Sequence, residues 1–444
     1  MRFVETLKNI WKIEDLRKRL CYTFMLVVIY RFGCYILLPG LTPTDVKPLQ
    51  DFTSNGLMQL VDMFSGGAFS QASVFALGIM PYITASIVIQ LLGIILPSFK
   101  KLQQEGESGR MKLNQYTRYL TVGILCLQGP AYLANFHLQV AQAGGTVSFT
   151  FFTYLYYTLI LASGSMFIMW LGEKITDRGV GNGISFIILV GIIARLPLAF
   201  VQEFTNRLTS AQGGLVMFLV EVIILFGIIA CAVLLVQGIR KVPVQYAKRI
   251  VGNKQIGGAR QYIPLKVNAA NVMPIIFAQA IMFIPITLAG FNTADSSSFV
   301  RALTDMHGFW YNAVYFVLII AFTYFYTAIT VRPTDIADQL KRNNGFIPGV
   351  KPGKATADYL DSIMSRITLP GSIFLGIVAI LPAIANVCGV SQQFSQFFGG
   401  TSLLILVGVV LDTLQQIESH LMMRHYDGLL KSGKIKGRTT GSMY

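Results

Sequence analysis

Few residues of this sequence could do chemistry, and they are scattered along it. Arg31, Glu221 and Asp412 are the clear ionisable residues inside long apolar segments. Charged side chains at such positions mark a functional pathway by default. The alternative is an ion pair or a hydrogen bond that holds helices together. We favour this alternative, because an ion-coupled transporter would show more polar residues clustered near the middle of its spans.

Motifs for catalysis, metal binding or nucleotide binding do not occur in the sequence. There is no HExxH, no GxSxG and no GxxxxGK[ST], so the common protease, hydrolase and phosphate-binding sites have no support. The histidines lie outside the apolar segments or at their ends: His137, His307, His420 and His425. The cysteines form no CxxC pair and read as free thiols: Cys21, Cys34, Cys126, Cys231 and Cys388. We expect no enzyme activity, no catalytic residues, no metal and no cofactor.

The composition is that of a polytopic membrane protein. Of the 444 residues, 53% are hydrophobic and only 13% are charged, and the mean hydropathy is +0.58. A soluble domain carries about 25% charged residues. Ten segments are long enough to cross a bilayer, which needs about 20 apolar residues: 20–38, 73–96, 116–135, 150–171, 183–202, 214–237, 269–290, 309–331, 367–387 and 401–421.

The basic residues are distributed very unevenly between the connections. Of 36 Lys and Arg residues, 31 lie in connections on the side of both termini, and Arg31 lies in the first span. The remaining four belong to the opposite face: Lys47, Arg195, Arg207 and Arg301. Lys and Arg accumulate in cytoplasmic loops, which predicts that both termini are cytoplasmic. The basic, amphipathic N-terminal segment does not read as a cleavable signal.

The stretch from Leu57 to Pro97 is unusual. Its first part, Leu57 to Phe64, is apolar but too short to cross a bilayer, and Ser65-Gly66-Gly67 then breaks the chain. The following run from Ser73 to Leu96 predicts one complete spanning helix with Pro81 inside it. A half-length helix ahead of a complete one indicates a re-entrant segment. Such a segment must line a cavity or be buried in protein.

Two connections on the basic side are too long for simple turns. Residues 237–267 contain seven basic and no acidic residues, and their loose alternation around two glycine-containing breaks predicts a protruding β-hairpin. Residues 331–366 contain FIPGVKPGKATADYL, in which Pro and Gly predict a rigid turn before a short amphipathic helix. Protruding basic loops suit docking of a large acidic partner, such as ribosomal RNA or an acidic protein surface.

Several long motifs in order resemble the SecY family of protein-conducting channels along essentially the whole chain. These are MFSGGAFSQASVFALGIMPYITASIVIQLL (63–92), EGESGRMKLNQYTRY (105–119), WLGEKITDRGVGNGIS (170–185), IPLKVNAANVMPIIFA (263–278), GFIPGVKPGKAT (345–356) and FFGGTSLLILV (397–407). The resemblance implies an all-α integral membrane protein with ten transmembrane helices. They would form two pseudo-symmetric five-helix halves, like a clamshell around an hourglass pore, in one membrane domain of residues 1–444. The halves would be 1–202 and 203–421, with docking loops at 238–268 and 332–366 and a tail at 422–444.

The resemblance also implies a pore ring of branched aliphatic side chains. Its members would be Ile79, Ile83, Ile184, Ile188, Ile276 and Ile405. Residues spaced by four share one helix face, and an aliphatic constriction dewets and blocks ions without gripping a passing chain. Spacing alone would fit lipid-facing or packing isoleucines equally well.

By the same resemblance, residues 57–69 would form a plug that seals the external funnel. Its candidate residues are Leu60, Asp62, Met63, Phe64, Ser65, Gly66 and Gly67. The family often has a neutral residue at the position of Asp62, and we expect this charge to face water or to pair with a basic group. A lateral gate between the second and seventh spans would use Gln90, Asn268 and Asn271 as polar contacts. Weak interhelical hydrogen bonds of about 0.6 kcal/mol suit an interface that must part.

The resemblance implies docking through the basic loops as well. Candidate contacts for a motor or a ribosome are Arg240, Lys241, Lys248, Arg249 and Lys351. Lys351 stands where the family has arginine, which keeps the charge but loses the planar fork. The implied partners are SecE and SecG-type small membrane subunits, a SecA-type ATPase motor, the ribosome, signal sequences, unfolded polypeptide substrates and membrane lipid. The implied location is the bacterial cytoplasmic (inner) membrane.

The resulting hypothesis is a passive gated channel for secretory polypeptides that also releases transmembrane segments sideways into lipid. One rival is a secondary transporter with inverted repeats and broken helices, which would need a polar substrate site where this chain has isoleucines. The other rival is a purely structural assembly subunit, which leaves the half-length helix and its Gly-Gly break unexplained.

Overall fold

The computed structural model describes residues 13–53, 57–142, 150–209, 214–246, 249–251, 254–256, 260–270, 272–279, 281–282 and 308–431. The chain divides into two compact units. Unit 1 comprises Met1–Ser54, Met58–Ile193 and Val409–Tyr444, and unit 2 comprises Asn55–Leu57 and Ala194–Gly408.

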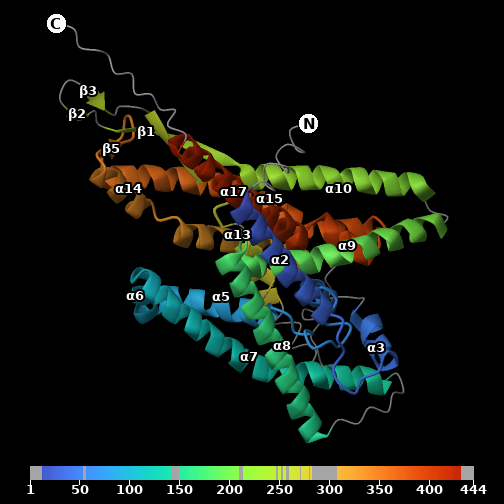
Figure 1. Cartoon of the computed structure of the whole chain (residues 1–444). Coiled ribbons are helices and arrows are strands. Elements are labelled where there is room, and N and C mark those ends of the chain that lie inside the picture. The colour runs from blue at the N-terminus through green and yellow to red at the C-terminus, as the bar shows by residue number, and fades with distance from the viewer. Residues whose placement is uncertain are drawn as a thin grey trace. The chain divides into compact units, whose positions relative to one another are not determined.

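Unit 1 is built from helices that pack around the long helix α7. In chain order, its helices are α2 (Glu14–Gly33), α3 (Pro43–Thr53), α4 (Leu57–Phe64), α5 (Met80–Ile95), α6 (Pro97–Gln104), α7 (Glu107–Gln142), α8 (Phe151–Arg178) and the first part of α9 (Gly183–Thr209). Helices α7 and α8 lie side by side (Figure 1), and α7 also packs against α3, α5 and α6. A bidentate ion pair between Arg118 and Glu173 joins α7 to α8 at one end.

The prediction of one continuous helix over 73–96 is wrong. Helix α5 begins at Met80, and Pro81 lies in its first turn, where the missing N–H needs no intrahelical acceptor. Residues 65–79 form turns instead. Backbone hydrogen bonds hold this segment beside the end of α2, from Leu38 N to Ala72 O (3.0 Å) and from Val74 N to Ile36 O (2.9 Å). These bonds satisfy a non-helical backbone inside an apolar environment.

Unit 2 contains the remaining helices and a small sheet. Its helices are α10 (Gly214–Gln237), α13 (Phe309–Thr330), α14 (Pro333–Arg342), α15 (Lys354–Val387), α16 (Gln392–Ser395), the 3-10 helix η1 (Gln396–Phe398), and parts of α9 and of α17 (Gly400–Lys431). Helices α13 and α15 pack against each other along their length (Figure 1). The amphipathic helix predicted after the Pro/Gly turn is not a separate short helix, because it continues into the predicted span 367–387 as α15.

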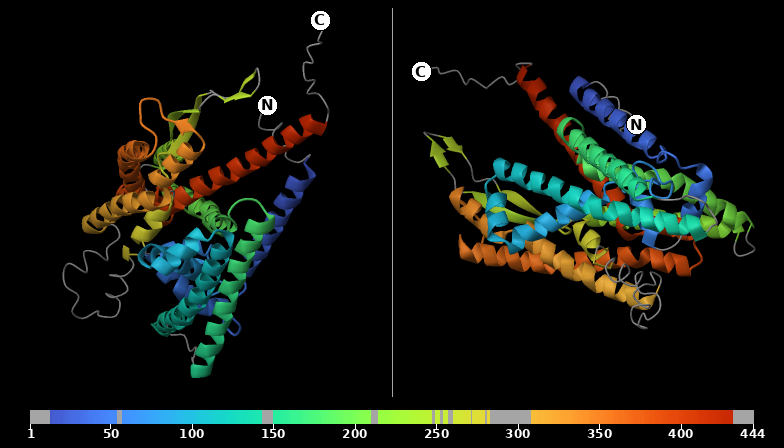
Figure 2. Two further views of the ribbon diagram at one scale, coloured as in Figure 1. Left: turned by 90° about the vertical axis from the view of Figure 1, so that its left-hand side faces the viewer. Right: turned by 90° about the horizontal axis from the view of Figure 1, so that it is seen from below.

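The protruding hairpin is confirmed, and it belongs to a larger folded module. Strands β1 (Ile239–Tyr246) and β4 (Arg260–Lys266) pair antiparallel, with β2 (Arg249–Val251) and β3 (Lys254–Ile256) between them in sequence. Strand β5 (Gly345–Phe346), from the second long connection, pairs with β1 to give the order β4-β1-β5. The hairpin therefore lies beside α14 and the start of α15 (Figure 2).

One hydrophobic core joins both connections. It is formed by buried side chains of the sheet, α14 and α15: Val242, Val244, Leu265, Leu340, Ile347, Leu360 and Met364. We call residues 238–268 and 332–366 together the two-loop module. The sequence predicted two separate loops, and their common core became visible only in the structure.

The helices are those of a multi-pass membrane protein. Among the described residues, six helices are long and apolar enough to cross a membrane, or seven if α5 and α6, bent by 104°, count as one span. Helix α10 has only 11% of its most apolar window buried inside the protein, as expected for a lipid-facing helix. Nine of the ten predicted spans overlap a described helix; the seventh is helical over 273–279 and 281–282, and its remainder lies outside the described residues.

Exposed aromatic side chains mark the ends of α8 and α13 away from the basic loops. Phe151 and Phe152 are more than 70% exposed at the start of α8, and Phe309 and Trp310 are exposed at the start of α13. Amphipathic aromatic residues, above all Trp and Tyr, are enriched at membrane–water interfaces. Their position is consistent with a membrane boundary at this end of each helix.

Candidate functional site

The short helix α4 ends in a glycine cap. It spans Leu57–Phe64, as the sequence predicted. Gly66 N donates to Met63 O (3.1 Å) and Gly67 N donates to Asp62 O (2.9 Å), which is the Schellman pattern of helix termination. Gly66 has a φ of +67°, a conformation that glycine adopts without steric cost. The Gly-Gly pair therefore terminates the helix and reverses the chain direction within unit 1.

The plug residues that follow α4 form a closed, buried turn. Ser65 Oγ donates to Asp62 O (3.0 Å) and accepts a hydrogen bond from Phe69 N (3.1 Å). The expectation that Asp62 faces water is wrong, since only 4% of this residue is exposed. Its Oδ1 accepts a hydrogen bond from Ser70 N at 2.8 Å. The carboxylate thus ties the turn to the end of α4.

Apolar packing holds the same segment in unit 1. Met63 and Phe64 are buried, and Leu60 lies in α4. The ring of Phe69 meets Tyr132 of α7 edge to face at 4.8 Å between centroids. The Tyr132 hydroxyl also donates to Phe69 O at 2.9 Å. The predicted plug is therefore a seated element with both polar and apolar contacts.

Three side chains at the C-terminal end of α2 converge on two consecutive carbonyls of the predicted plug: Tyr30 and Arg31 in the helix and Cys34 directly after it. Tyr30 Oη donates to Ser65 O at 3.2 Å, and Arg31 Nη1 donates to Gly66 O at 2.8 Å. Cys34 Sγ lies 3.8 Å from the same Ser65 carbonyl oxygen. Of the two readings for Arg31, the structure shows a hydrogen bond between elements, and its acceptor lies in the segment predicted as the plug.

The plug backbone also approaches α9 very closely. A Cβ added to Gly191 would lie 3.1 Å from Phe64 O and 3.2 Å from Gly66 N. A Cβ added to Gly66 would lie 3.0 Å from Gly191 Cα. Such distances are shorter than normal carbon contacts, so a side chain at either glycine would force the neighbouring backbone to shift. Gly66 is prominent in the sequence beside Gly67, whereas Gly191 lies inside an apolar segment, and its role shows only in the fold.

The predicted ring isoleucines all lie at the starts of helices. Ile79 precedes α5, and Ile83 N donates to Ile79 O at 3.1 Å, so this pair spans one helical turn. Ile184 and Ile188 lie in the first two turns of α9, and Ile405 lies early in α17. Four of the residues belong to unit 1, whereas Ile276 and Ile405 belong to unit 2. The ring as a whole stays a prediction.

A repeated local pattern links two of these helix starts. Met80-Pro81 begins α5, and Met273-Pro274 begins the helix at 273–279. Ile83 and Ile276 each lie two residues after the proline. Proline in the first helical turn is favourable. In both helices a predicted ring isoleucine is therefore the fourth residue, at the end of the first turn. The sequence contained this MPxI repeat, and the sequence analysis did not use it.

The start of α9 is held by side chains from three other helices or turns. Asn182 Oδ1 accepts from Ile184 N (3.1 Å) as an N-cap. Val180 N donates to Thr23 Oγ1 of α2 (3.2 Å), and Gly181 N donates to Gln416 Oε1 of α17 (2.9 Å). The turn before Ile184 is thus fixed by contacts within unit 1 that no local motif predicts.

The described contacts do not join the predicted lateral-gate residues to one another. Gln90 Nε2 contacts Ser86 Oγ of its own helix at 3.4 Å. Asn268 is buried, and its Oδ1 has no hydrogen-bond partner among the described residues. Asn271 lies outside the described residues. Gln90 belongs to unit 1 and Asn268 to unit 2, so the gate stays a prediction.

The predicted docking residues lie on the two-loop module. Arg240 and Lys241 are exposed on β1, and Lys351 is exposed in the turn before α15. The Lys351 carbonyl accepts a hydrogen bond from Thr356 Oγ1 at 2.9 Å, which fixes this turn to α15. Arg249 is placed in β2 by its backbone, and Lys248 lies outside the described residues.

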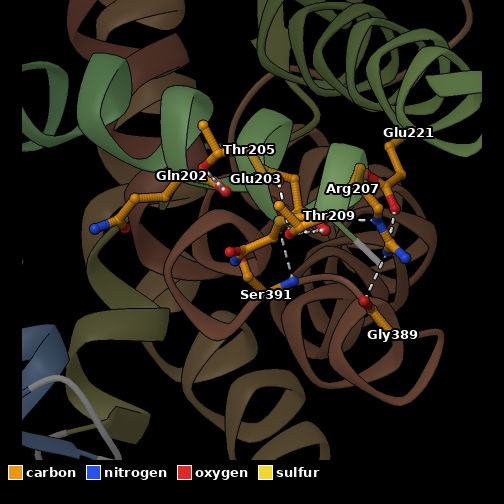
Figure 3. A network of polar contacts seen from close by, with 9 residues as sticks. Gln202, Glu203, Thr205, Arg207, Thr209, Glu221, Gly389 and Ser391 are labelled. Atoms are coloured by element: carbon orange, nitrogen blue, oxygen red, sulfur yellow. Dashed lines mark hydrogen bonds and ion pairs between the residues drawn. The ribbon is translucent and has the colours of Figure 1, made fainter. Parts of the chain in front are cut away.

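Glu221 belongs to a buried charged network in unit 2 (Figure 3). Arg207 Nη2 donates to Glu221 Oε1 (2.5 Å) and to Gly389 O (2.6 Å), and Arg207 Nε donates to Glu203 Oε1 (2.9 Å). Glu203 Oε2 accepts from Ser391 N at 3.0 Å. The ion pair expected for Glu221 is therefore confirmed. Its partner Arg207 was assigned to a loop, whereas α9 extends to Thr209 and includes it.

The third intramembrane candidate, Asp412, has a different environment. It is exposed on α17, and no ion pair joins it to a basic residue in the described part of the chain. The described residues also contain no group of three or more His, Cys, Asp or Glu side chains that could hold a metal ion.

Known proteins similar in sequence match this chain from end to end. A protein translocase subunit SecY of Streptomyces scabiei is 43% identical over 433 residues, which cover 95% of this chain and 98% of that protein. A protein translocase subunit SecY of Mycobacterium tuberculosis (strain ATCC 25618 / H37Rv) is 41% identical over 447 residues, covering 97% and 99%.

Solved structures share the fold at low sequence identity. A protein-conducting channel matches with a TM-score of 0.63 at 18% identity, over 96% of both chains. A SecY protein studied for its plug domain gives 0.61 at 18% identity, over 96% of both chains. Canine Sec61 from a ribosome-channel complex of the endoplasmic reticulum gives 0.60 at 18% identity, over 96% of both chains. The fold is therefore the all-α fold of these membrane channels.

The model of one protein family matches most of the chain. It is the SecY model, and the match extends over residues 73–414. Together with relatives above 40% identity over nearly the whole length, it shows that this chain belongs to the SecY family.

Proposed function

We propose that this protein conducts unfolded secretory polypeptides across the cytoplasmic membrane and releases transmembrane segments laterally into lipid. As a member of the SecY family it is a protein-translocation channel. The observation that carries the proposal for this chain is the seated plug. A half-length helix and a glycine turn are buried against α2, α7 and α9, beside helix starts that carry isoleucines.

The proposed path solves a solvation problem. An extended polypeptide cannot cross hydrocarbon, because each unsatisfied backbone group costs several kcal/mol. We propose that a water-lined route passes through a ring of Ile79, Ile83, Ile184, Ile188, Ile276 and Ile405. Branched aliphatic side chains would close around the chain and exclude ions. The isoleucine pairs in the first turns of α5 and α9 support this arrangement.

Opening would require two movements. A signal sequence would intercalate between the second and seventh spans, near Gln90, Asn268 and Asn271, and the plug would leave its seat. Of the similar solved SecY protein it is stated that the plug domain stabilises the closed state and maintains a membrane seal. We propose the same role for residues 57–69. The two halves of the clamshell, 1–202 and 203–421, would part at this gate.

Orientation and location are part of the proposal. The excess of Lys and Arg on one side supports cytoplasmic termini and a cytoplasmic two-loop module. The exposed aromatic residues at the starts of α8 and α13 would then lie at the external interface. The bacterial relatives support a location in the cytoplasmic (inner) membrane.

Energy would come from partners, because we propose no catalytic function for this chain itself. The similar Sec61 chain comes from a ribosome-channel complex, which supports the ribosome as a partner. A SecA-type motor and SecE and SecG-type subunits complete the proposal. The exposed Arg240, Lys241 and Lys351 on the rigid two-loop module would contact an acidic partner surface.

Photocrosslinking tests this proposal directly. Photoreactive groups would be placed at Ile83, Ile276 and Ile405, one at a time, and a secretory chain would be stalled during transport. Contact at all three positions, lost when the signal sequence is deleted, is the expected result. Labelling of lipid-facing positions only would refute the channel and favour a structural subunit. Leu234, exposed on α10, provides the lipid-facing control.

A further inference from the structure

We infer that Arg31 and Tyr30 form a latch that holds the plug in its seat, with Arg31 as the principal positioning residue. The inference rests on the proposed function, since it assigns to α2 the control of a plug that seals a channel. It concerns the resting state and does not involve the path of the polypeptide through the ring.

The geometry of α2 fits this role. Tyr30 and Arg31 are consecutive, and their donors reach the consecutive carbonyls of Ser65 and Gly66 at 3.2 and 2.8 Å. Tyr30 is 1% exposed, so its hydroxyl has been removed from water to make this contact. Arg31 Nη2 also lies 3.2 Å from Tyr35 Oη, and the guanidinium lies 5.5 Å from the Tyr35 ring centroid. Tyr35 thus contacts the same guanidinium that donates to Gly66.

The chemistry of the acceptors makes the contact reversible. Arg31 donates to a backbone carbonyl, and within the described chain no ion pair joins it to a carboxylate. A hydrogen bond with one charged partner is stronger than a neutral one. If the plug leaves, the carbonyls can be solvated by water and no carboxylate is left without its partner. The hydrogen bonds of the latch therefore hold the plug in the resting state, and they can break when the channel opens.

The steric fit of Gly66 is an independent observation that points to the same contact. A Cβ on Gly66 would lie 2.7 Å from Arg31 Nη1 and 3.0 Å from Gly191 Cα. The guanidinium and the α9 backbone therefore both lie close to the position that a Gly66 side chain would take. The Gly66 carbonyl can reach Arg31 only while the plug occupies this seat.

The test uses the full chain in its native complex, reconstituted into planar bilayers. We compare the resting ion conductance of the wild type with that of Arg31→Gln, Arg31→Lys and Tyr30→Phe. The control is Arg17→Gln, which removes an exposed arginine from the same helix. We expect Arg31→Gln to raise the resting conductance about tenfold, which corresponds to about 1.4 kcal/mol. Arg31→Lys and Tyr30→Phe should raise it less, and Arg17→Gln should leave it unchanged.

A second readout separates a latch from a general loss of stability. A looser plug lowers the cost of opening, so Arg31→Gln should transport a substrate whose signal segment is too weakly apolar for the wild type. A merely destabilised protein would transport less of every substrate. Wild-type conductance in Arg31→Gln overturns the latch. If that variant does not accumulate, unchanged conductance in Tyr30→Phe overturns it.

The proposed function can fail separately. If the wild type does not transport a secretory chain with an intact signal sequence, the channel proposal is wrong. A conductance rise in Arg31→Gln would still show that Arg31 seals an ion path through this protein.

Discussion

Two arginine sites, one in each unit, differ in what the guanidinium contacts: Arg207 is buried, whereas Arg31 is partly exposed. In unit 1, Arg31 donates to the carbonyl of Gly66, which belongs to a short glycine-capped turn. In unit 2, Arg207 donates to two carboxylates and to a carbonyl, from α9, α10 and the turn after α15. The difference lies in the charge of the acceptors.

That difference decides what happens when the contact breaks. Removing Arg207 leaves Glu203 and Glu221 charged and buried, with 1% and 3% of their side chains exposed. An uncompensated buried charge is strongly destabilising. Removing Arg31 leaves two uncharged groups without its guanidinium, the Gly66 carbonyl and the Tyr35 hydroxyl. We call the network of Arg207, Glu203 and Glu221 the clasp of unit 2 and expect it to stay intact. The Arg31 contact, by contrast, could break when the proposed plug moves.

Arg207→Met should have the largest effect. We expect it to destabilise the protein by about 3–5 kcal/mol, because two buried carboxylates lose their partner. The measurement is unfolding monitored by protease resistance in membranes. Adding Glu203→Gln and Glu221→Gln to Arg207→Met should restore part of the stability, since the uncompensated charges are then gone. A single variant as stable as the wild type would contradict the clasp.

Gly66→Ala should have the second-largest effect. It should impair closure of the channel by the proposed plug more than it impairs folding of the protein. Alanine at a φ of +67° is strained by about 1–3 kcal/mol, and its Cβ would meet Arg31 and Gly191. We expect a higher resting conductance with a nearly normal amount of protein in the membrane. Gly123→Ala is the matched control, because a Cβ at Gly123 in α7 meets no atom within 4 Å.

Glu221→Gln should have an intermediate effect on the clasp. Glutamine keeps one oxygen acceptor for Arg207, and Glu203 still provides a charge, so a loss of about 1–2 kcal/mol is expected. Glu221 Oε2 has no hydrogen-bond partner among the described residues, so the amide group displaces no existing bond. Resting conductance should stay at the wild-type level. A conductance rise here would mean that the clasp also controls the plug.

Cys34→Ala should have the smallest effect. A thiol is a weak donor, and Cys34 Sγ lies 3.8 Å from the Ser65 carbonyl oxygen. We expect a change in resting conductance smaller than that of Tyr30→Phe, and measurement of the two variants side by side checks the order. The reverse order would assign the latch to the thiol.

Several local features could be predicted from the sequence because they depend on neighbouring residues. The apolar run from Leu57 to Phe64 and the glycines behind it define a short helix and its cap, and both agree with the structure. Sequence alternation and glycine breaks predicted the hairpin of β1 and β4. The continuous helix over 73–96 was wrong, because hydropathy alone does not report that Pro81 begins a helix.

Asp62 shows why the environment of a side chain is harder to predict. A charge in an apolar segment suggested contact with water or with a basic group. The carboxylate is buried away from water, and the folded turn places Ser70 N at 2.8 Å from it. The amide that satisfies Asp62 belongs to a residue outside α4, and only the path of the turn brings it there.

By itself, the sequence determined the membrane class, the uneven distribution of basic residues, the half-length helix with its glycine stop, and the family motifs. These are sums over composition or patterns between neighbours. Only the tertiary structure decided that Arg207 contacts carboxylates and that Arg31 contacts a carbonyl of the predicted plug. Arg31 and Gly66 are 35 residues apart, and Arg207 and Gly389 are 182 residues apart. Such pairs form because whole helices pack in one arrangement, and no local pattern in the chain encodes that choice.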